Sequence, residues 1–279
     1  MKMEELQHRQ SNTGKGSVHY WVAKHPDENA TCIVFTHGMT ADHSMFAPQI
    51  EHFTQNYTVI AWDMPLHGQS MPYQGFSYRQ TAAELRAILT QEGIHRVVLV
   101  GMSMGGHPSQ MFAHLYPELV AGLIALDTLP LGPQYYTKFS MAAITKLPTL
   151  LKWLPEKEIK KNMVKSICHT EETRAITQKL LAPLTKAEIL NQLSALFKAF
   201  LMENCKVNLT CPGLILLGEF DTIAGIQGTC AIWAKNTGYP LQIIKNAGHF
   251  SSGDNAPQVN EAIARFIEAD CERYCFYNE

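Results

Sequence analysis

One hexapeptide constrains the fold of this chain more than any other stretch. Residues 101–106 read Gly-Met-Ser-Met-Gly-Gly, follow a run of branched aliphatic residues at 97–100 and precede a helix-like segment at 107–116. Branched aliphatic runs favour buried strands, and small residues let a chain turn sharply into a helix. The sequence therefore predicts a strand, a tight turn and a helix, with Ser103 at the turn.

Gly-x-Ser-x-Gly in this setting is typical of a nucleophile elbow, in which a strained turn projects the serine hydroxyl. The amide of Met104 would then lie at a helix N-terminus, where the helix dipole stabilises a developing oxyanion. A second such amide is expected from Met39, because Gly38 would let the loop after a predicted strand bend inward. The alternative is that the serine only caps the helix.

Composition and charge narrow the class of protein. The 279 residues are 46% hydrophobic and 17% charged, which suits one large α/β domain with an insertion. The formal net charge of -2 gives no basic surface for nucleic acid, and no apolar run approaches the roughly 20 residues that span a bilayer. The first residues are too polar for a secretory signal, and the seven dispersed cysteines lack metal-site spacing. We expect a cytoplasmic protein that acts on a small molecule, without nucleic acid or a transmembrane segment.

Strands and helices alternate through most of the chain. Apolar strands are predicted at 17–22, 31–36, 57–62, 97–100, 120–126, 212–217 and 241–244. The alternation predicts an α/β fold with a mostly parallel central sheet flanked by helices and with ligands at the carboxyl ends of the strands. His37, Asp63, Ser103 and Asp127 all follow such strands. We interpret Asp63 as a structural carboxylate that braces neighbouring backbone amides.

The pattern changes between residues 129 and 208, where strand signals disappear and helical segments dominate. We therefore predict a helical cap at 129–208, inserted between the first part of the core at 1–128 and the second part at 209–279. The charged run at 156–161 is interpreted as a solvated helix face. Several apolar cap residues are expected to pack against the core, to line a pocket or to open onto a membrane surface. They are Phe139, Met141, Ile144, Leu147, Leu150, Leu151, Trp153 and Leu154.

Three residues have the types and the order that nucleophilic catalysis needs. Ser103, Asp221 and His249 each follow a predicted strand. A histidine can take the proton of a serine hydroxyl, and a carboxylate on its other nitrogen fixes the tautomer. Serine, aspartate, histidine is the chain order of the α/β-hydrolase arrangement.

With these residues and their motifs the chain resembles the α/β-hydrolase fold superfamily over essentially its whole length. The motifs are His37-Gly38, residues 63–70, residues 101–106, residues 218–221 and residues 248–250. The resemblance implies that Ser103 is the nucleophile, that His249 is the general base and acid, and that Asp221 orients His249. It also implies oxyanion donation by the amides of Met39 and Met104. The sequence departs from the family at Leu66, where a glycine is more common, and this affects loop geometry rather than chemistry.

Asp127 is an alternative to Asp221, since some proteins of this fold carry the acid after the strand that follows the elbow. Candidate substrate contacts are Thr40, Asp42, His43 and His107. The hypothesis is a capped serine hydrolase for a small-to-medium, fairly apolar ester, acting through an acyl-enzyme with no metal and no organic cofactor. The alternatives are lactone, thioester or carbon–carbon bond hydrolysis, for which Arg174 is the one cap arginine that could hold a substrate carboxylate, and a ligand receptor on the same fold.

Overall fold

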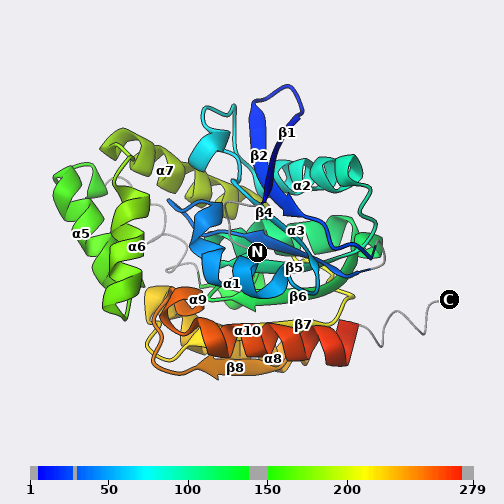
Figure 1. Cartoon of the computed structure of the whole chain (residues 1–279). Coiled ribbons are helices and arrows are strands. Elements are labelled where there is room, and N and C mark those ends of the chain that lie inside the picture. Colours follow the sequence, from blue (N-terminus) through cyan, green and yellow to red (C-terminus); the bar gives the residue numbers. More distant parts are fainter. Residues whose placement is uncertain (1–5, 28–29, 138–149, 272–279) are drawn as a thin grey trace.

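The fold is centred on one twisted sheet, seen in a computed structural model that describes residues 6–27, 30–137 and 150–271 (Figure 1). Its eight strands lie in the order β1-β2-β4-β3-β5-β6-β7-β8. They are β1 (Gln7–Asn12), β2 (Ser17–Ala23), β3 (Cys32–Thr36), β4 (Thr58–Trp62), β5 (Val97–Met102), β6 (Val120–Leu126), β7 (Gly213–Gly218) and β8 (Leu241–Ile244). Strands β1, β2 and β4 pair antiparallel, and β4 to β8 pair parallel. The prediction of a mostly parallel central sheet is confirmed.

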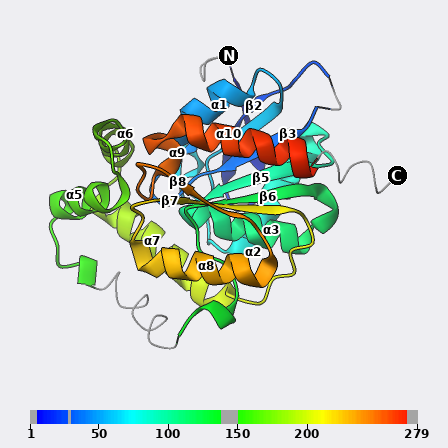
Figure 2. The same cartoon turned by 90° about the horizontal axis from the view of Figure 1, so that it is seen from below.

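Helices cover both faces of the sheet (Figure 2). One face carries α1 (Ala47–Phe53) and α10 (Ala256–Phe266), whose apolar residues join one core cluster. The other face carries α2 (Tyr78–Glu92), α3 (Gly106–Leu115) and α8 (Ile226–Thr237). This three-layer arrangement is that of a doubly covered α/β sheet.

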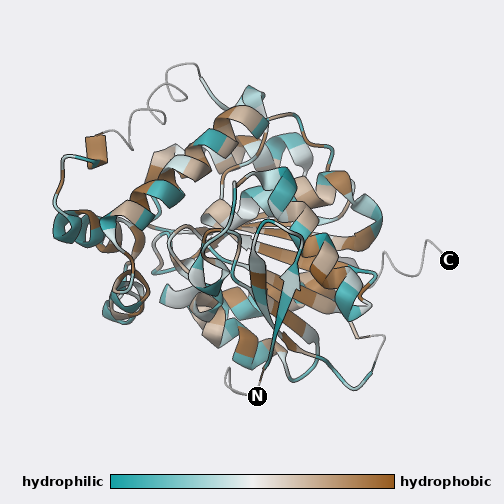
Figure 3. Ribbon diagram, turned by 90° about the horizontal axis from the view of Figure 1, so that it is seen from above, coloured by the Kyte–Doolittle hydropathy of each residue, from teal (hydrophilic) through white to brown (hydrophobic). Residues whose placement is uncertain are grey.

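The central strands are buried on both faces, which explains why they read as unbroken apolar runs. In β3, Ile33 and Phe35 join the cluster under α1 and α10, whereas Val34 joins the cluster under α2 and α3. Side chains alternate between faces along a strand, so each strand feeds both layers. Figure 3 shows these strands in brown between helices of mixed hydropathy.

Strand β1 is the one strand of the described sheet that the sequence does not predict. Its residues, Gln7 to Asn12, are polar and mostly exposed, and it pairs only with β2 at the edge of the sheet. An edge strand needs backbone pairing on one side and little apolar burial, so hydrophobic periodicity does not reveal it.

Between β6 and β7 the chain forms α5 (Glu156–Ile167), α6 (Glu171–Leu181) and α7 (Lys186–Glu203). All three gather at one end of the sheet (Figures 1 and 2). The charged run predicted to be a solvated face begins α5, with Ile159 buried beneath it.

The predicted cap residues Phe139, Met141, Ile144 and Leu147 lie outside the described residues. Among the other four, Leu151 contacts the core, while Trp153 is 85% exposed. No helix in the described ranges has the length and apolar character to cross a membrane.

Candidate active site

Ser103 sits on the sharp turn between β5 and α3. Its φ of 51° is in the left-handed region, and a short 3-10 turn at Ser103–Gly105 leads into α3. A Cβ at Gly101 would lie 2.7 Å from backbone atoms of both Gly105 and Gly106, so only glycine permits this close approach of strand and helix. The structure therefore has the strained elbow that the motif predicts.

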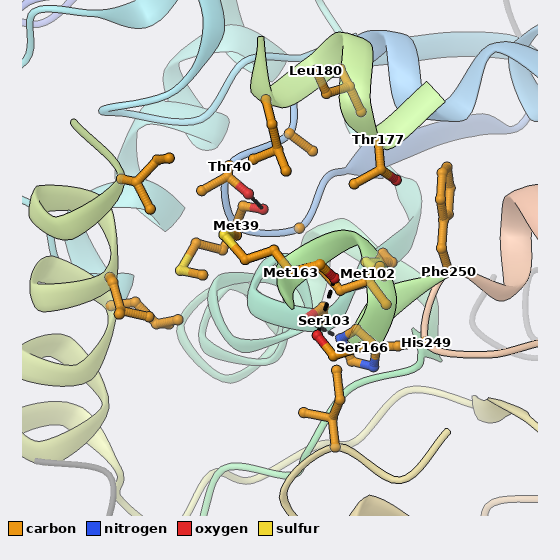
Figure 4. Close-up of a pocket in the computed structure, with 18 of the residues that line it drawn as sticks. Met39, Thr40, Met102, Ser103, Met163, Ser166, Thr177, Leu180, His249 and Phe250 are labelled. Carbon is orange, nitrogen blue, oxygen red and sulfur yellow. Dashed lines mark hydrogen bonds between the residues drawn. The ribbon is translucent and has the colours of Figure 1, made fainter. Parts of the chain in front are cut away.

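Ser103, His249 and Asp221 form a continuous hydrogen-bonded chain. The Ser103 Oγ lies 2.7 Å from the His249 Nε2, and the His249 Nδ1 lies 2.7 Å from the Asp221 Oδ2. Figure 4 shows Ser103 and His249 side by side. The second oxygen of Asp221 accepts a hydrogen bond of 3.0 Å from the amide of Ile223, which fixes the carboxylate. The three side chains come from the ends of β5, β7 and β8, brought together by the parallel sheet.

The environment of His249 favours its protonated form. Burial lowers the pKa of His249, but the hydrogen bond and charge of Asp221 outweigh it, so that the pKa is raised above its ordinary value. An imidazole of this kind accepts a proton readily and holds it as an imidazolium.

Asp127 is buried close to this chain but has other partners. Its Oδ1 accepts a 2.8 Å hydrogen bond from the amide of Gly218, and its Oδ2 accepts from the amide and the hydroxyl of Ser251. Burial raises the pKa of Asp127 to about 7. Since Gly218 precedes Asp221 and Ser251 follows His249, Asp127 ties together the two loops that carry them.

The loop after β3 forms the wall beside Ser103, with a bend at a different residue from the one expected. The left-handed residue is Thr40, with φ of 60°, and not Gly38. A Cβ at Gly38 would lie 2.8 Å from the Met102 Sδ, so a larger residue there would displace that side chain. The Thr40 hydroxyl donates a 2.6 Å hydrogen bond to the Met39 carbonyl, and both residues line the cavity next to Ser103 (Figure 4).

Asp63 braces the loop that precedes α1. Its Oδ1 accepts 2.8 Å hydrogen bonds from the amide and the Nδ1 of His43, and its Oδ2 accepts one of 2.7 Å from the amide of Gln69. Asp42 caps the next turn by accepting from the amide of Ser44 at 2.8 Å. Asp42 and His43 are thus bonded within the loop, whereas Thr40 lines the cavity; a role in substrate contact stays a prediction for all three.

Three of these groups also approach one another closely enough to hold a cation. Within the described ranges, Asp42, His43 and Asp63 have ligand atoms within 4.8 Å of one another. The Asp63 Oδ1 and the His43 Nδ1 are already paired with each other, so the hydrogen-bonded loop accounts for the cluster.

The backbone conformation of Leu66 explains why a glycine is more common at this position in the family. Its φ is 68°, a conformation that glycine adopts without strain and leucine does not. The Leu66 carbonyl accepts a 2.7 Å hydrogen bond from the Gln192 side chain of α7, which joins this loop to the helices above it.

Two cavities of about 330 and 480 Å³ adjoin at Ser103, which lines both. They share Ser103, Leu196, Phe197, Ile223 and His249. The first lies under α5, α6 and α7, and the second extends past Met104 toward His107, Thr128, Leu129 and Phe200. Among their described lining residues there is no lysine, arginine or glutamate. The site is therefore apolar around one reactive group.

Thr128 also lines this site, although no sequence motif singles it out. Its hydroxyl donates a 2.6 Å hydrogen bond to the carbonyl of Ser103 and so holds the elbow. The available signal was its position after Asp127 at the end of a predicted strand.

Known proteins share both the sequence pattern and the fold. A model of the α/β hydrolase fold family matches residues 31–163. An sn-1-specific diacylglycerol lipase of Mus musculus is 25% identical over 253 residues, covering 86% of this chain and 82% of that protein. A 2-hydroxy-6-oxononadienedioate/2-hydroxy-6-oxononatrienedioate hydrolase of Klebsiella pneumoniae is 26% identical over 227 residues, 76% of each chain.

A solved structure of a thermophilic esterase from Thermogutta terrifontis superposes with a TM-score of 0.76 at 22% identity, covering 94% of this chain and 98% of that one. The chain has the α/β-hydrolase fold, residues 31–163 match the model of that family, and the relatives indicate a hydrolase. The resemblance inferred from the motifs is confirmed at this level.

Proposed function

We propose that this protein is a serine hydrolase that cleaves a small-to-medium, fairly apolar carboxylic ester through an acyl-enzyme. The observation that carries the proposal is the chain of 2.7 Å contacts from Ser103 through His249 to Asp221, at the point where two apolar cavities meet. Such a chain activates a hydroxyl that is otherwise a poor nucleophile.

In the first half of the reaction, the Ser103 Oγ attacks the ester carbonyl carbon while its proton passes to the His249 Nε2. Asp221 stabilises the resulting imidazolium through the Nδ1 hydrogen bond. The carbonyl oxygen becomes an oxyanion, for which the amides of Met39 and Met104 are the proposed donors. Each donor of this kind contributes about 2.7–4 kcal/mol to transition-state stabilisation.

The tetrahedral intermediate then collapses with cleavage of the carbon–oxygen bond to the alcohol. The imidazolium of His249 gives its proton to the leaving oxygen, and the acyl group stays on Ser103. In the second half, water gives a proton to His249 and adds to the acyl carbon. Release of the acid returns the proton to the Ser103 oxygen.

We include in the proposal that residues 129–208 act as a cap over the sheet edge. The described helices α5, α6 and α7 supply one wall of the first cavity, with Met163, Leu180 and Leu193 among its lining. A wall of this kind excludes water from the acyl-enzyme and selects apolar substrates.

The position of Arg174 favours an ester as substrate over the carboxylate-bearing substrate of a carbon–carbon bond hydrolase. Arg174 lies on α6, where it pairs with Glu171 and donates to the carbonyl of His169, and it lines neither cavity. A carboxylate-bearing substrate would thus lack this cation at Ser103. Lactones and thioesters offer the same electrophilic carbonyl as an ester, and the hydrogen-bonded chain favours turnover over a receptor role.

A cytoplasmic setting is also proposed. Five cysteines of the described ranges are free thiols: Cys32, Cys168, Cys205, Cys211 and Cys230. Free thiols are typical of reducing compartments.

Labelling with a fluorophosphonate tests the proposal. Mass spectrometry of the wild type should show one adduct, on Ser103, and Ser103→Ala should show none. Ser166→Ala is the matched control, because Ser166 also lines the first cavity but lies outside the hydrogen-bonded chain, and this variant should keep the label. A folded wild-type protein without an adduct on Ser103 would contradict the proposal.

A further inference from the structure

The two cavities that meet at Ser103 differ in chemistry. The first is lined mostly by aliphatic, methionine and phenylalanine side chains, and its hydroxyl groups other than that of Ser103 already have partners. The Ser166 hydroxyl donates to the Met163 carbonyl, and the Thr177 hydroxyl lies 3.0 Å from the Cys168 Sγ. The Thr40 hydroxyl is also bonded to its own loop, so away from Ser103 and His249 the described hydroxyls of this cavity have partners already and the rest of its lining is apolar.

The second cavity is lined by His107, whose side chain has an unpaired buried nitrogen. His107 lies at the start of α3, is 8% exposed, and places its Nδ1 3.2 Å from the Tyr78 hydroxyl. Its Nε2 is buried and has no hydrogen-bond partner among the described residues. The Thr128 hydroxyl, which also lines this cavity, is committed to the carbonyl of Ser103, and the Asp127 carboxylate is bonded to the amides of Gly218 and Ser251.

His107 is neutral at physiological pH. Burial lowers its pKa to about 4, so the imidazole carries one N–H donor and one acceptor nitrogen. Buried polar atoms without a partner are rare, because they lose their hydrogen bonds to water and gain none within the protein. A ligand group that pairs with the Nε2 would restore that loss.

We propose that the substrate of this site is an ester of an aliphatic acid with a diol or a triol. Its acyl chain would lie in the first cavity, and a free hydroxyl of its alcohol would bind the His107 Nε2 in the second. This inference rests on the proposed function, because the two arms of an ester diverge from the carbonyl carbon that Ser103 attacks. The arm made only of carbon and hydrogen suits the cavity without free polar groups. A hydroxyl both donates and accepts, so it pairs with either tautomer of His107.

Matched substrates test the assignment of the hydroxyl. Propyl and 2-hydroxyethyl octanoate differ by one methyl-to-hydroxyl exchange in the alcohol. We expect the wild type to prefer the hydroxyethyl ester in kcat/KM and His107→Phe to lose that preference by about tenfold or more, since a site built to bind a hydroxyl discriminates strongly. His107→Asn, which keeps a donor and an acceptor, should restore part of the preference. A preference in His107→Phe equal to that of the wild type would overturn the role of His107.

Filling each cavity tests which arm enters it. Met163→Trp narrows the first cavity and should lower the ratio of kcat/KM for ethyl octanoate over ethyl acetate about tenfold, with little change between ethyl and benzyl acetate. Leu129→Trp narrows the second cavity and should lower the ratio of kcat/KM for benzyl acetate over ethyl acetate, with little change in the ratio of ethyl octanoate over ethyl acetate. Opposite assignments, or equal shifts in both series, would overturn the proposal.

Two controls separate these outcomes from other failures. Met163→Ala and Leu129→Ala enlarge the same cavities, should shift the same ratios in the opposite direction, and replace the tryptophan variants if those do not fold. Ser103 labelling is measured on every variant. If an enzyme that is labelled at Ser103 hydrolyses the esters with the wrong selectivity, only the assignment of the acyl and alcohol arms to the two cavities is refuted. If the wild type shows neither labelling nor hydrolysis, the proposed function itself is refuted.

Discussion

Two aspartate–histidine pairs of similar geometry lie at the carboxyl edge of the sheet. The Asp221 Oδ2 is 2.7 Å from the His249 Nδ1, and the Asp63 Oδ1 is 2.8 Å from the His43 Nδ1. Both aspartates are buried and both follow parallel strands, β7 and β4. The aspartate–histidine contact by itself therefore does not distinguish the two sites.

The difference lies in what else the imidazole contacts. The Nε2 of His249 faces the Ser103 hydroxyl in an apolar cavity, whereas the ring of His43 stacks on Trp21 with 3.3 Å between ring centroids. The amide of His43 is also bound to Asp63, so that pair closes a loop on itself. An aspartate–histidine pair can therefore serve nucleophilic catalysis only where the second ring nitrogen of the histidine reaches a nucleophile.

The largest effect is expected on the first pair. Asp221→Asn should lower kcat for ester hydrolysis about 10⁴-fold, because the amide favours the wrong tautomer of His249. Steady-state kinetics with a soluble ester measure this loss. Thermal unfolding followed by circular dichroism confirms that the variant is folded.

The matched control is Asp127→Asn, which changes the nearby carboxylate that binds Gly218 and Ser251. Its kcat should fall far less than that of Asp221→Asn. The assignment of the acid would be refuted by a 10⁴-fold loss in Asp127→Asn together with a near-normal Asp221→Asn.

Asp63→Asn should instead act on stability. In this variant the new side-chain NH₂ group replaces one acceptor oxygen and faces a backbone N–H of the loop, so that a buried donor loses its partner. This costs about 1–3 kcal/mol in free energy of unfolding. Urea denaturation measures the loss, and kcat should change less than tenfold. A variant with normal stability and strongly reduced kcat would show that the second pair also serves catalysis.

The stability difference should depend on pH in a defined direction. Burial raises the pKa of Asp63, but the hydrogen bonds and charge of His43 outweigh it and hold the pKa below 3.8. Its stabilising contribution is therefore present above pH 3.8 and is lost as the pH falls through the folded value. The gap between wild type and Asp63→Asn should close under acid conditions.

The smallest effect is a shift of the pH–rate profile. In the proposed mechanism His249 acts as a base when neutral. Its pKa is raised above 6.5, so kcat/KM should fall with decreasing pH through a midpoint above 6.5. Asp221→Asn should move that midpoint to lower pH, and Asp63→Asn should leave it in place. An unmoved midpoint in Asp221→Asn would separate Asp221 from the titration of His249.

Much of the fold could be read from the sequence because buried parallel strands are continuous apolar runs. The residues that follow those runs, Ser103, Asp221 and His249 among them, were thereby placed at one edge. Strand β1 was missed because an edge strand carries no apolar pattern. The sequence favours a bend at Gly38, because a threonine with a left-handed backbone is rare. The bend lies at Thr40 instead, because tertiary packing overrides this local preference.

The sequence by itself determined the α/β architecture, the strained serine turn and the set of polar residues at the strand ends. Only the tertiary structure decided that His249 pairs with Asp221 while Asp127 binds Gly218 and Ser251, that His43 closes onto Asp63, and that His107 keeps an unpaired nitrogen beside a cavity. The physical reason is the separation in sequence between the groups that interact. Strands and turns follow from neighbours in the chain, whereas a hydrogen-bond partner is chosen by distances of a few ångströms between residues far apart in sequence.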